Sequence, residues 1–286
     1  MFFLFKTLSR LPLVWAHRLG ALAGVLVYLA SPRYRRNLRE NMRAAGLDAN
    51  LAWPAAAEAG KQALEISHIW MKSQAEANAQ IVEITGGEHV AAAKAAGRGV
   101  LFLTPHLGCF EIAAQYCAAA FGDLTVLYRP PRQKSLQRMI LAGRQRPGLH
   151  LATADLSGVR ALIKALKKGE AVGMLPDQAP KAGEGAWIEF FGRPAYTMTL
   201  AARLSETGAT VLMVWGERLP QGRGYRLHYS PPSQAITGDT LTRAQKINQE
   251  IERLIRCCPT QYLWGYNRYK GYKGDPEAVA PTASEQ

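Results

Sequence analysis

A histidine and a glutamate five residues apart form the first pair in this sequence whose types could carry chemistry. The apolar run over residues 100–104 predicts a strand, which leads through His106 and Gly108 into a helix expected to begin near Cys109, with Glu111 in its first turn. A neutral imidazole is suited to take a proton from a hydroxyl, and a carboxylate on its other nitrogen would fix its tautomer. The pair therefore predicts general-base chemistry, such as acyl transfer to an alcohol, and a buried structural histidine is the alternative.

The same spacing occurs a second time, at His150 and Asp155. Asp155 directly precedes an amphipathic segment over residues 156–166, so we interpret it as the N-cap of that helix and His150 as an ordinary strand residue. At His106, by contrast, Gly108 permits a tight turn between the base and the carboxylate. The surroundings favour His106 as the functional histidine.

The elements that must position this pair are predicted from short apolar runs that alternate with helical segments. Runs beginning at residues 100, 124, 171 and 210 predict buried strands, and helical periodicity occurs over residues 51–79, 156–166 and 247–255. This order predicts an α/β fold with a central mixed sheet flanked by helices. We expect a membrane anchor with a basic juxtamembrane segment over residues 1–45, a catalytic domain over residues 46–273 and a disordered tail over residues 274–286.

The N-terminal segment is apolar and is followed by arginines. Residues 11–16 and 19–30 carry no charge, His17 and Arg18 lie between them, and five arginines follow within residues 33–43. This pattern predicts a membrane-associated helix with a cytoplasmic flank. A short or tilted span and a helix lying in the interface both fit it, and a buried core helix is the alternative. No cleavage site of the signal-peptide type follows, so secretion is not expected.

The charge balance indicates an acidic partner. Lys and Arg outnumber Asp and Glu by 35 to 22, which suits nucleic acid, anionic lipid or an acidic carrier protein. Motifs of nucleic-acid-binding proteins are absent, so no nucleic-acid partner is expected. The four cysteines form no CxxC pair, which predicts neither a disulfide framework nor a zinc site. We expect a reducing compartment and neither a metal nor an organic cofactor.

Positive charge is concentrated shortly after the proposed base. Guanidinium groups suit phosphate and carboxylate oxygens, so this segment could steer an acidic carrier or a phosphorylated lipid, although a solvated helix face is the alternative. Aromatic residues further on could line a slot for an acyl chain or pack in the core. The basic residues are Arg129, Arg132, Lys134, Arg138, Arg144 and Arg146, and the aromatic residues are Trp187, Phe190, Phe191 and Tyr196.

Several separated motifs occur together with His106, Gly108 and Glu111. They are YRPP at residues 128–131, Arg144, PDQ at 176–178, FFG at 190–192 and QYLW at 261–264. In this order they resemble the bacterial lipid A late acyltransferases, the lauroyl and myristoyl transferase family within the lysophospholipid acyltransferase-like superfamily. The resemblance extends from the N-terminal segment to about Lys270, and it implies a sheet of the glycerolipid acyltransferase type.

The resemblance also implies an activity and a location. Members of the family use acyl carrier protein thioesters to acylate a hydroxyl on an existing acyl chain of a lipid A precursor, an anionic glycolipid. They do so without a covalent enzyme intermediate, at the cytoplasmic face of the bacterial inner membrane. Carried over, His106 is the catalytic base and Glu111 its partner.

Other positions take substrate-binding roles by the same resemblance. Arg144 would meet phosphate or thioester oxygen, and Asp177 would organise the pocket. Apart from the resemblance, Arg129 belongs to the basic segment, and backbone amides near Gly108 could stabilise the oxyanion. Two positions depart from the family pattern. Cys109 and Phe110 fill variable positions of the first motif, and Ala179 follows PDQ where many members carry a second Asp. Acyl length and acceptor therefore stay open.

Three other functions remain as alternatives. A thioesterase would use Cys109 as nucleophile and His106 as its base. A related transferase would acylate a different membrane lipid. A non-enzymatic nucleic-acid or membrane-surface binder would use only the positive charge.

Overall fold

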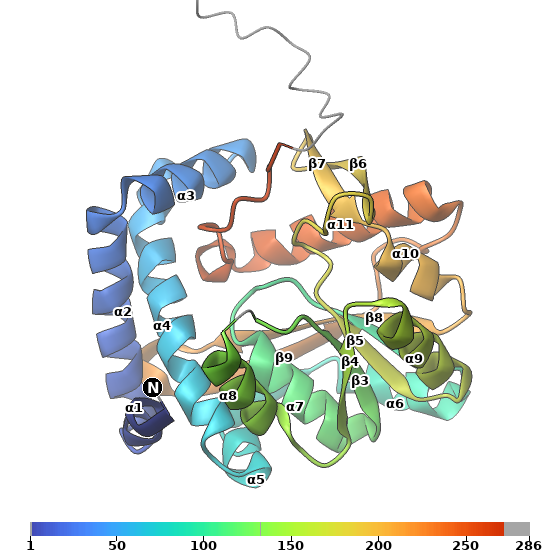
Figure 1. Cartoon of the computed structure of the whole chain (residues 1–286), viewed down its shortest axis with the longest axis horizontal. Helices are drawn as coiled ribbons and strands as arrows, with labels where there is room; N and C mark the ends of the chain where they lie inside the picture. The colour runs from blue at the N-terminus through green and yellow to red at the C-terminus, as the bar shows by residue number, and fades with distance from the viewer. Residues whose placement is uncertain (1, 132, 272–286) are drawn as a thin grey trace, which may run out of the picture.

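A seven-stranded mixed sheet forms the centre of the protein. The structure is a computed structural model that describes residues 2–131 and 133–271, so the predicted tail over residues 274–286 lies outside the described residues. The strand order is β1-β9-β8-β2-β5-β3-β4; β9 runs antiparallel to β8, and the other neighbouring strands are parallel (Figure 1). The predicted fold, an α/β protein with a central mixed sheet between helices, is confirmed.

The bounds of the elements follow the chain in order. The strands are β1 (Ile81–Thr85), β2 (Val100–Leu103), β3 (Leu124–Tyr128), β4 (Leu149–Thr153), β5 (Ala171–Met174), β6 (Gly185–Phe190), β7 (Arg193–Met198), β8 (Thr210–Arg218) and β9 (Tyr225–Ser230). The α-helices are α1 (Phe2–Leu8), α2 (Leu13–Ala30), α3 (Pro32–Ala44), α4 (Ala52–Trp70), α5 (Gln74–Asn78), α6 (Gly87–Ala96), α7 (Phe110–Phe121), α8 (Lys134–Arg144), α9 (Leu156–Lys167), α10 (Leu200–Ser205) and α11 (Thr240–Cys257). Strands β6 and β7 form a separate antiparallel hairpin.

Strand β2 shows why the central strands read as continuous apolar runs. All four of its residues are buried, and they alternate between two core clusters, one on each face of the sheet. Leu101 and Leu103 pack in the cluster that also contains residues of α9, α10 and α11, whereas Val100 and Phe102 pack in the cluster that contains residues of α7. A strand covered on both faces can carry no polar side chain until it ends, so chemistry must begin at the strand ends.

The predicted elements are largely present. The four predicted strands correspond to β2, β3, β5 and β8, and the segment over residues 51–79 forms α4 and α5. Helix α5 begins at a capping box that Ser73 and Glu76 make, which separates it from α4. Asp155 is the N-cap of α9, where it accepts from the amides of Ser157 and Gly158, as predicted.

Packing is continuous across the predicted boundary between residues 45 and 46. Helix α2 lies along α4 at one edge of the molecule, and α3 extends from its end (Figure 1). Tyr28 of α2 and Leu38 of α3 belong to the same buried cluster as Leu101 of the central sheet. The N-terminal helices are therefore part of the packed body of the protein.

Candidate active site

Two parallel neighbouring strands bring His106 and Asp177 together. Strands β2 and β5 pair with Leu103 opposite Met174, and each strand ends at that residue. His106 and Asp177 each lie three residues beyond their strand end. Because parallel strands end at the same edge of a sheet, equal offsets place the two side chains side by side.

The two residues form a hydrogen-bonded pair. The Nδ1 atom of His106 is 2.8 Å from Oδ1 of Asp177, and the His106 backbone amide donates to Oδ2 at 3.0 Å. The carboxylate is 1% exposed, whereas the imidazole is 18% exposed. Burial alone would raise the pKa of Asp177, but the charge and hydrogen bonds of His106 outweigh it and lower that pKa. An ionised Asp177 therefore favours the tautomer with the proton on Nδ1 and leaves Nε2 as the basic nitrogen of the ring.

Glu111 does not make the predicted contact with His106. Helix α7 begins at Phe110, and from its first turn Glu111 receives hydrogen bonds from Trp70 Nε1 at 2.9 Å and from Arg144 Nε at 3.1 Å. Arg144 Nη2 also donates to the other carboxylate oxygen of Glu111, so the two side chains form a fork. The prediction that Glu111 orients the base is corrected: Asp177 is the carboxylate on Nδ1, and Glu111 holds Arg144.

The turn that carries His106 requires glycine at position 108. Gly108 has φ +58°, and a Cβ there would lie 1.9 Å from the carbonyl oxygen of Gly216. The Gly108 amide donates to the Gln261 carbonyl at 3.1 Å, and the Cys109 amide donates to the Gly216 carbonyl at 2.7 Å. The amides expected near Gly108 for the oxyanion are thus already engaged, so the turn holds the base in place.

Two distant segments brace this turn. Gln62 of α4 donates from Nε2 to the Gly108 carbonyl at 3.0 Å, and the Leu263 amide donates to the His106 carbonyl at 3.1 Å. The side chain of Gln261 also bonds both the amide and the carbonyl of Arg218 in β8. The QYLW motif therefore supports the loop of the base. Gln62 has no recognisable motif around it, and sequence reasoning missed it.

An apolar cavity adjoins the pair. It lies between α7 and strands β2, β3 and β5, and its wall includes Phe102, Val126 and Met174. Thr104 and Phe110 also line it, and the Phe110 ring is 5.0 Å from the imidazole of His106, centre to centre. Glu111 and Arg144 are the charged residues of the wall. His106 itself does not line the cavity, whose volume of about 70 Å³ is well below that of a usual ligand pocket.

Cys109 faces another part of the protein. Its side chain is 2% exposed and lies beside Glu65 and Arg218, and the described residues show no hydrogen bond between it and His106. Burial, followed by the charge of Glu65, raises the pKa of the thiol well above its usual value. A thiol that stays protonated is a poor nucleophile, so the geometry disfavours the thioesterase alternative.

The basic segment divides into residues with different surroundings. Arg129, Lys134 and Arg138 are exposed, and Arg132 lies outside the described residues. Arg146 donates from Nη2 to three backbone carbonyls around the end of α4, those of Ile69, Trp70 and Lys72, and so has a structural role. Of this segment, Arg144 is the residue held beside the cavity.

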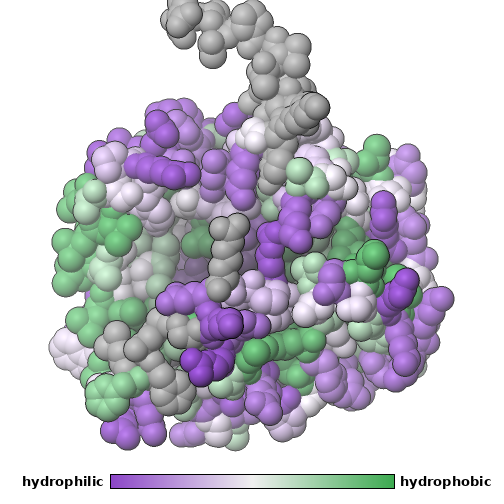
Figure 2. Space-filling model, in the orientation of Figure 1, coloured by the Kyte–Doolittle hydropathy of each residue, from purple (hydrophilic) through white to green (hydrophobic). Residues whose placement is uncertain are grey.

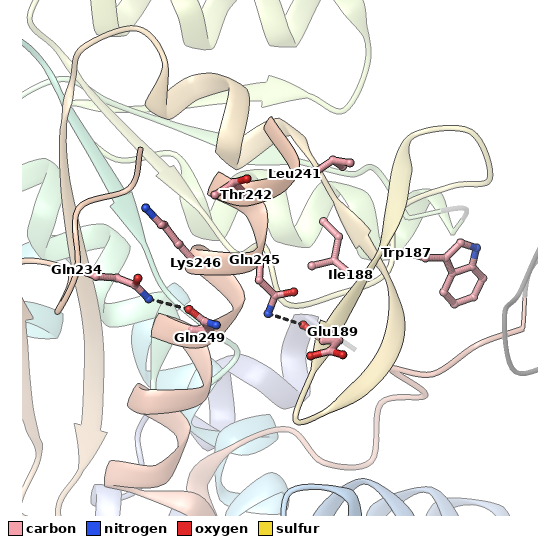
Figure 3. Close-up of a pocket in the computed structure, with 9 residues that line it drawn as sticks. All are labelled: Trp187, Ile188, Glu189, Gln234, Leu241, Thr242, Gln245, Lys246 and Gln249. Carbon is pink, nitrogen blue, oxygen red and sulfur yellow. Dashed lines mark hydrogen bonds between the residues drawn. The ribbon is translucent and has the colours of Figure 1, made fainter. Parts of the chain in front are cut away.

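The aromatic residues proposed for an acyl slot serve the core. Phe190, Phe191 and Tyr196 are at least 92% buried, and none of them lines the cavity next to His106. Trp187 lies at a different cavity of about 590 Å³ between β6 and α11, drawn in Figure 3. That cavity has the volume of a ligand pocket, but its charged wall residues are Glu189 and Lys246 and no histidine lines it. It offers no base for acyl transfer.

His150 and the metal-ligating residue types complete the inventory. His150 is exposed on β4 and its Nε2 is 2.8 Å from Asp123, which agrees with its interpretation as an ordinary strand residue. Over residues 2–131 and 133–271, no three His, Cys, Asp or Glu side chains converge as metal ligands would.

The fold and the pair together define an α/β protein with a histidine–aspartate pair at the carboxyl edge of its sheet. The chain belongs to the family of bacterial lipid A biosynthesis acyltransferases, whose sequence profile matches residues 2–271. The predicted family resemblance is thereby confirmed.

The names of the similar proteins specify different acyl groups and different acceptors. The chain is 30% identical to the lipid A biosynthesis lauroyltransferase of Escherichia coli K12 over 67% of this chain and 63% of the relative. It is 29% identical to the palmitoleoyltransferase of the same organism over 66% and 61%. It is 25% identical to a phosphatidylinositol mannoside acyltransferase of Mycobacterium tuberculosis over 64% and 58%. The matches thus cover less than two thirds of each relative.

Proposed function

We propose that this protein transfers a fatty acyl group from an acyl carrier protein thioester to a hydroxyl of a lipid A precursor. The observation that carries the proposal is the His106–Asp177 pair, whose imidazole is 18% exposed and lies against Phe110 in the wall of an apolar cavity. Family membership supplies the substrate class. The hydroxyl would be that of an acyl chain already on the glycolipid.

The chemistry follows from the state of the pair. His106 Nε2 takes the proton of the acceptor hydroxyl while its oxygen attacks the thioester carbonyl carbon. Asp177 stabilises the imidazolium that forms. The tetrahedral intermediate then collapses, the carbon–sulfur bond breaks, and the imidazolium returns the proton to the leaving thiolate. The ester is formed without a covalent enzyme intermediate.

Arg144 supplies fixed positive charge near the reaction. Burial would lower its pKa, but the charge and hydrogen bonds of Glu111 outweigh it and raise that pKa, so the guanidinium stays charged. A charged group held in a partly buried site needs little reorganisation when negative charge develops on a nearby oxygen. We assign Arg144 to a phosphate or thioester oxygen, and Glu111 to positioning Arg144.

At about 70 Å³ the apolar cavity is smaller than a fatty acyl chain, so its walls would have to move apart to receive the acyl chain of the donor. Its wall is made mainly of aliphatic and aromatic side chains, and Gly173 of β5 forms part of it. The exposed Arg129, Lys134 and Arg138 would attract the acidic carrier protein outside it. The site would work at the cytoplasmic face of the bacterial inner membrane, with no organic cofactor and no nucleic acid.

A direct assay tests the proposal. Detergent-solubilised protein is incubated with acyl carrier protein thioesters and a bisphosphorylated lipid A precursor, and the product masses are measured. The lipid should gain one acyl mass, and His106→Ala and Asp177→Asn should each abolish that gain. His150→Ala is the matched control, because it removes an exposed histidine that is also paired with an aspartate. Free fatty acid as the only product would contradict the proposal.

The second candidate function is acyl transfer to a different lipid acceptor. The similarity to a phosphatidylinositol mannoside acyltransferase favours this candidate. The same assay with a phosphatidylinositol mannoside in place of the lipid A precursor separates the two. Acylation of the mannoside alone would keep the mechanism and change the substrate.

A further inference from the structure

Helix α2 carries two faces of opposite character. It is long and apolar enough to cross a membrane by length and composition. The buried face consists of Ala16, His17, Gly20, Gly24 and Tyr28.

The opposite face of α2 is an exposed apolar stripe. Five large side chains at steps of four and three residues form it, each between 45% and 58% exposed: Trp15, Leu19, Leu22, Leu26 and Leu29. One of the hydrophobic areas of the surface, green in Figure 2, lies at the left edge, where α2 lies in Figure 1. This spacing is that of one side of a single helix.

The buried face is clamped to α4 by backbone contact. A Cβ on Gly60 would lie 1.9 Å from the Gly20 carbonyl oxygen, and a Cβ on Gly24 would lie 2.1 Å from that of Ala56. Near the start of α2, His17 Nε2 is 3.1 Å from Glu65 Oε2. Contacts this close leave no space for lipid between the two helices.

The clamp prevents α2 from crossing a bilayer alone. Helix α4 lies along it with Glu58, Lys61 and Glu65, and Glu65 is ion-paired to Arg218 of the central sheet. A span would carry these charges, and part of the sheet, into hydrocarbon, where charged side chains are costly.

Positive charge surrounds the stripe. Residues 1–45 contain eight Lys and Arg but one acidic residue, Glu40. Arg18 lies over the Trp15 ring at 4.9 Å, and Arg33, Arg36 and Arg43 are exposed on α3, directly after α2. An apolar helix face flanked by arginines complements the headgroup and upper acyl region of an anionic bilayer.

We infer that α2 lies flat in the surface of an anionic membrane, with its Trp15 to Leu29 stripe inserted and the α3 arginines on the headgroups. The helix docks the folded protein as one rigid piece and does not span. The inference deepens the proposed function, because it states how the enzyme meets its lipid acceptor. Gln62 of the same α4 braces the Gly108 turn, so the docking helices and the base belong to one packed unit.

Vesicle binding tests the docking surface. The full chain is mixed with vesicles of phosphatidylcholine alone or with phosphatidylglycerol added, and the bound fraction is measured by flotation. Binding should need phosphatidylglycerol. It should weaken about fivefold for each arginine removed in Arg33→Gln and Arg36→Gln. The matched controls Arg160→Gln and Arg203→Gln change exposed arginines of α9 and α10 at the far side of the molecule and should bind normally.

The stripe is tested by the double variant Leu22→Glu with Leu26→Glu. It should lose vesicle binding while it acylates detergent-dispersed acceptor at the normal rate. Leu156→Glu is the control, since Leu156 is 78% exposed on α9. Normal vesicle binding by the double variant would overturn the inference. A wild type that is dimeric by light scattering, together with a double variant that is monomeric, would also overturn it, because the stripe would then be an interface between two copies. If the wild type lacks transferase activity but binds vesicles, the proposed function fails and the docking stands.

Cysteine labelling distinguishes a helix α2 that lies in the membrane surface from one that crosses the bilayer. A single accessible cysteine is placed by Thr7→Cys on α1 or by Arg43→Cys on α3, with the exposed Cys257 and the partly exposed Cys258 both changed to serine. An impermeant maleimide added outside sealed vesicles should label both positions equally. Protection of one position with labelling of the other would show a span and refute the inference.

Discussion

Two histidine–carboxylate pairs in this protein look alike and do different work. His106 meets Asp177 at 2.8 Å, and His17 meets Glu65 at 3.1 Å, with both carboxylates 1% exposed. The His106 imidazole is 18% exposed beside a cavity, whereas that of His17 is 6% exposed between α2 and α4. Proton exchange with a substrate requires access to the free ring nitrogen, which only the first pair provides.

The carboxylates also differ in their other partners. Glu65 receives hydrogen bonds from Arg218 Nε at 2.7 Å and Nη2 at 2.5 Å, and from the Tyr225 hydroxyl at 3.1 Å. The arginine already neutralises Glu65, so His17 adds a link between helices. Asp177 forms no ion pair with an arginine among the described residues, but the buried Arg268 interacts with its charge and Tyr262 forms a hydrogen bond with it. The comparison teaches that a histidine–carboxylate distance does not identify a base, whereas exposure of the imidazole separates the two pairs.

The largest expected effect separates the two histidines. His106→Ala should lower kcat by about 10²-fold to 10⁴-fold, because the hydroxyl then loses its general base. The free energy of unfolding should also fall by roughly 1–3 kcal/mol, because the variant leaves the buried Asp177 carboxylate without its imidazole partner. Acylation kinetics and urea unfolding measure the two quantities.

His17→Ala is the matched variant for that prediction. It should keep kcat and lower the free energy of unfolding by roughly 1–3 kcal/mol, because it removes a buried hydrogen-bond partner. If His17→Ala lost as much kcat as His106→Ala at equal folding, the contrast between a clamp and a base would be wrong.

The next prediction concerns which carboxylate belongs to which partner. Asp177→Asn should reduce kcat by about 10²-fold or more, since an amide can stabilise the wrong tautomer of His106. In double-mutant cycles on transition-state stabilisation, Glu111→Gln with Arg144→Gln should couple by roughly 1–3 kcal/mol, because the two side chains act as one unit. Glu111→Gln with Asp177→Asn should be additive within about 0.5 kcal/mol. Strong coupling between the two acids would restore Glu111 as the partner of the base.

The sequence could predict the elements of this site better than its contacts. The strand before His106 and the helix that begins after Cys109 have local signals, and both are present. Glu111 was predicted as the partner of His106 because it is close in the sequence. Asp177 is 71 residues from His106 and becomes its neighbour only because β2 pairs with β5. Equal offsets from two buried strand ends were a usable signal, but it needs the strand order. The Glu65–Arg218 pair, 153 residues apart, has no such signal because helical polar residues are usually solvated.

A smaller effect should appear in the acid dependence of stability. Burial would raise the pKa of Glu65, but the charge and hydrogen bonds of Arg218 and His17 lower it from 4.5 to about 2. A carboxylate with a lowered pKa in the folded state stabilises the protein above pH 4.5, and that stabilisation is lost as pH falls toward about 2.

The measurement is urea unfolding of wild type and Glu65→Gln between pH 6 and pH 2.5. The glutamine variant should be less stable by roughly 3 kcal/mol at pH 6, and the difference should shrink as pH falls. A difference that stays constant with pH would mean that the charge of Glu65 does not link α2 to the sheet.

The smallest effect on kcat is expected at Cys109, the candidate nucleophile of the thioesterase alternative. Cys109→Ser should leave kcat within about twofold of wild type, because a buried and protonated thiol takes no part in the chemistry. The serine hydroxyl can remain beside Glu65 and Arg218, so folding should also persist. A loss of kcat as large as that of His106→Ala, together with acyl-protein detected by mass spectrometry in the wild type, would replace direct transfer with a covalent thiol mechanism. Normal turnover would place Cys109 with His17 and Glu65, in the part of the molecule that holds the helices together while His106 and Asp177 perform the transfer.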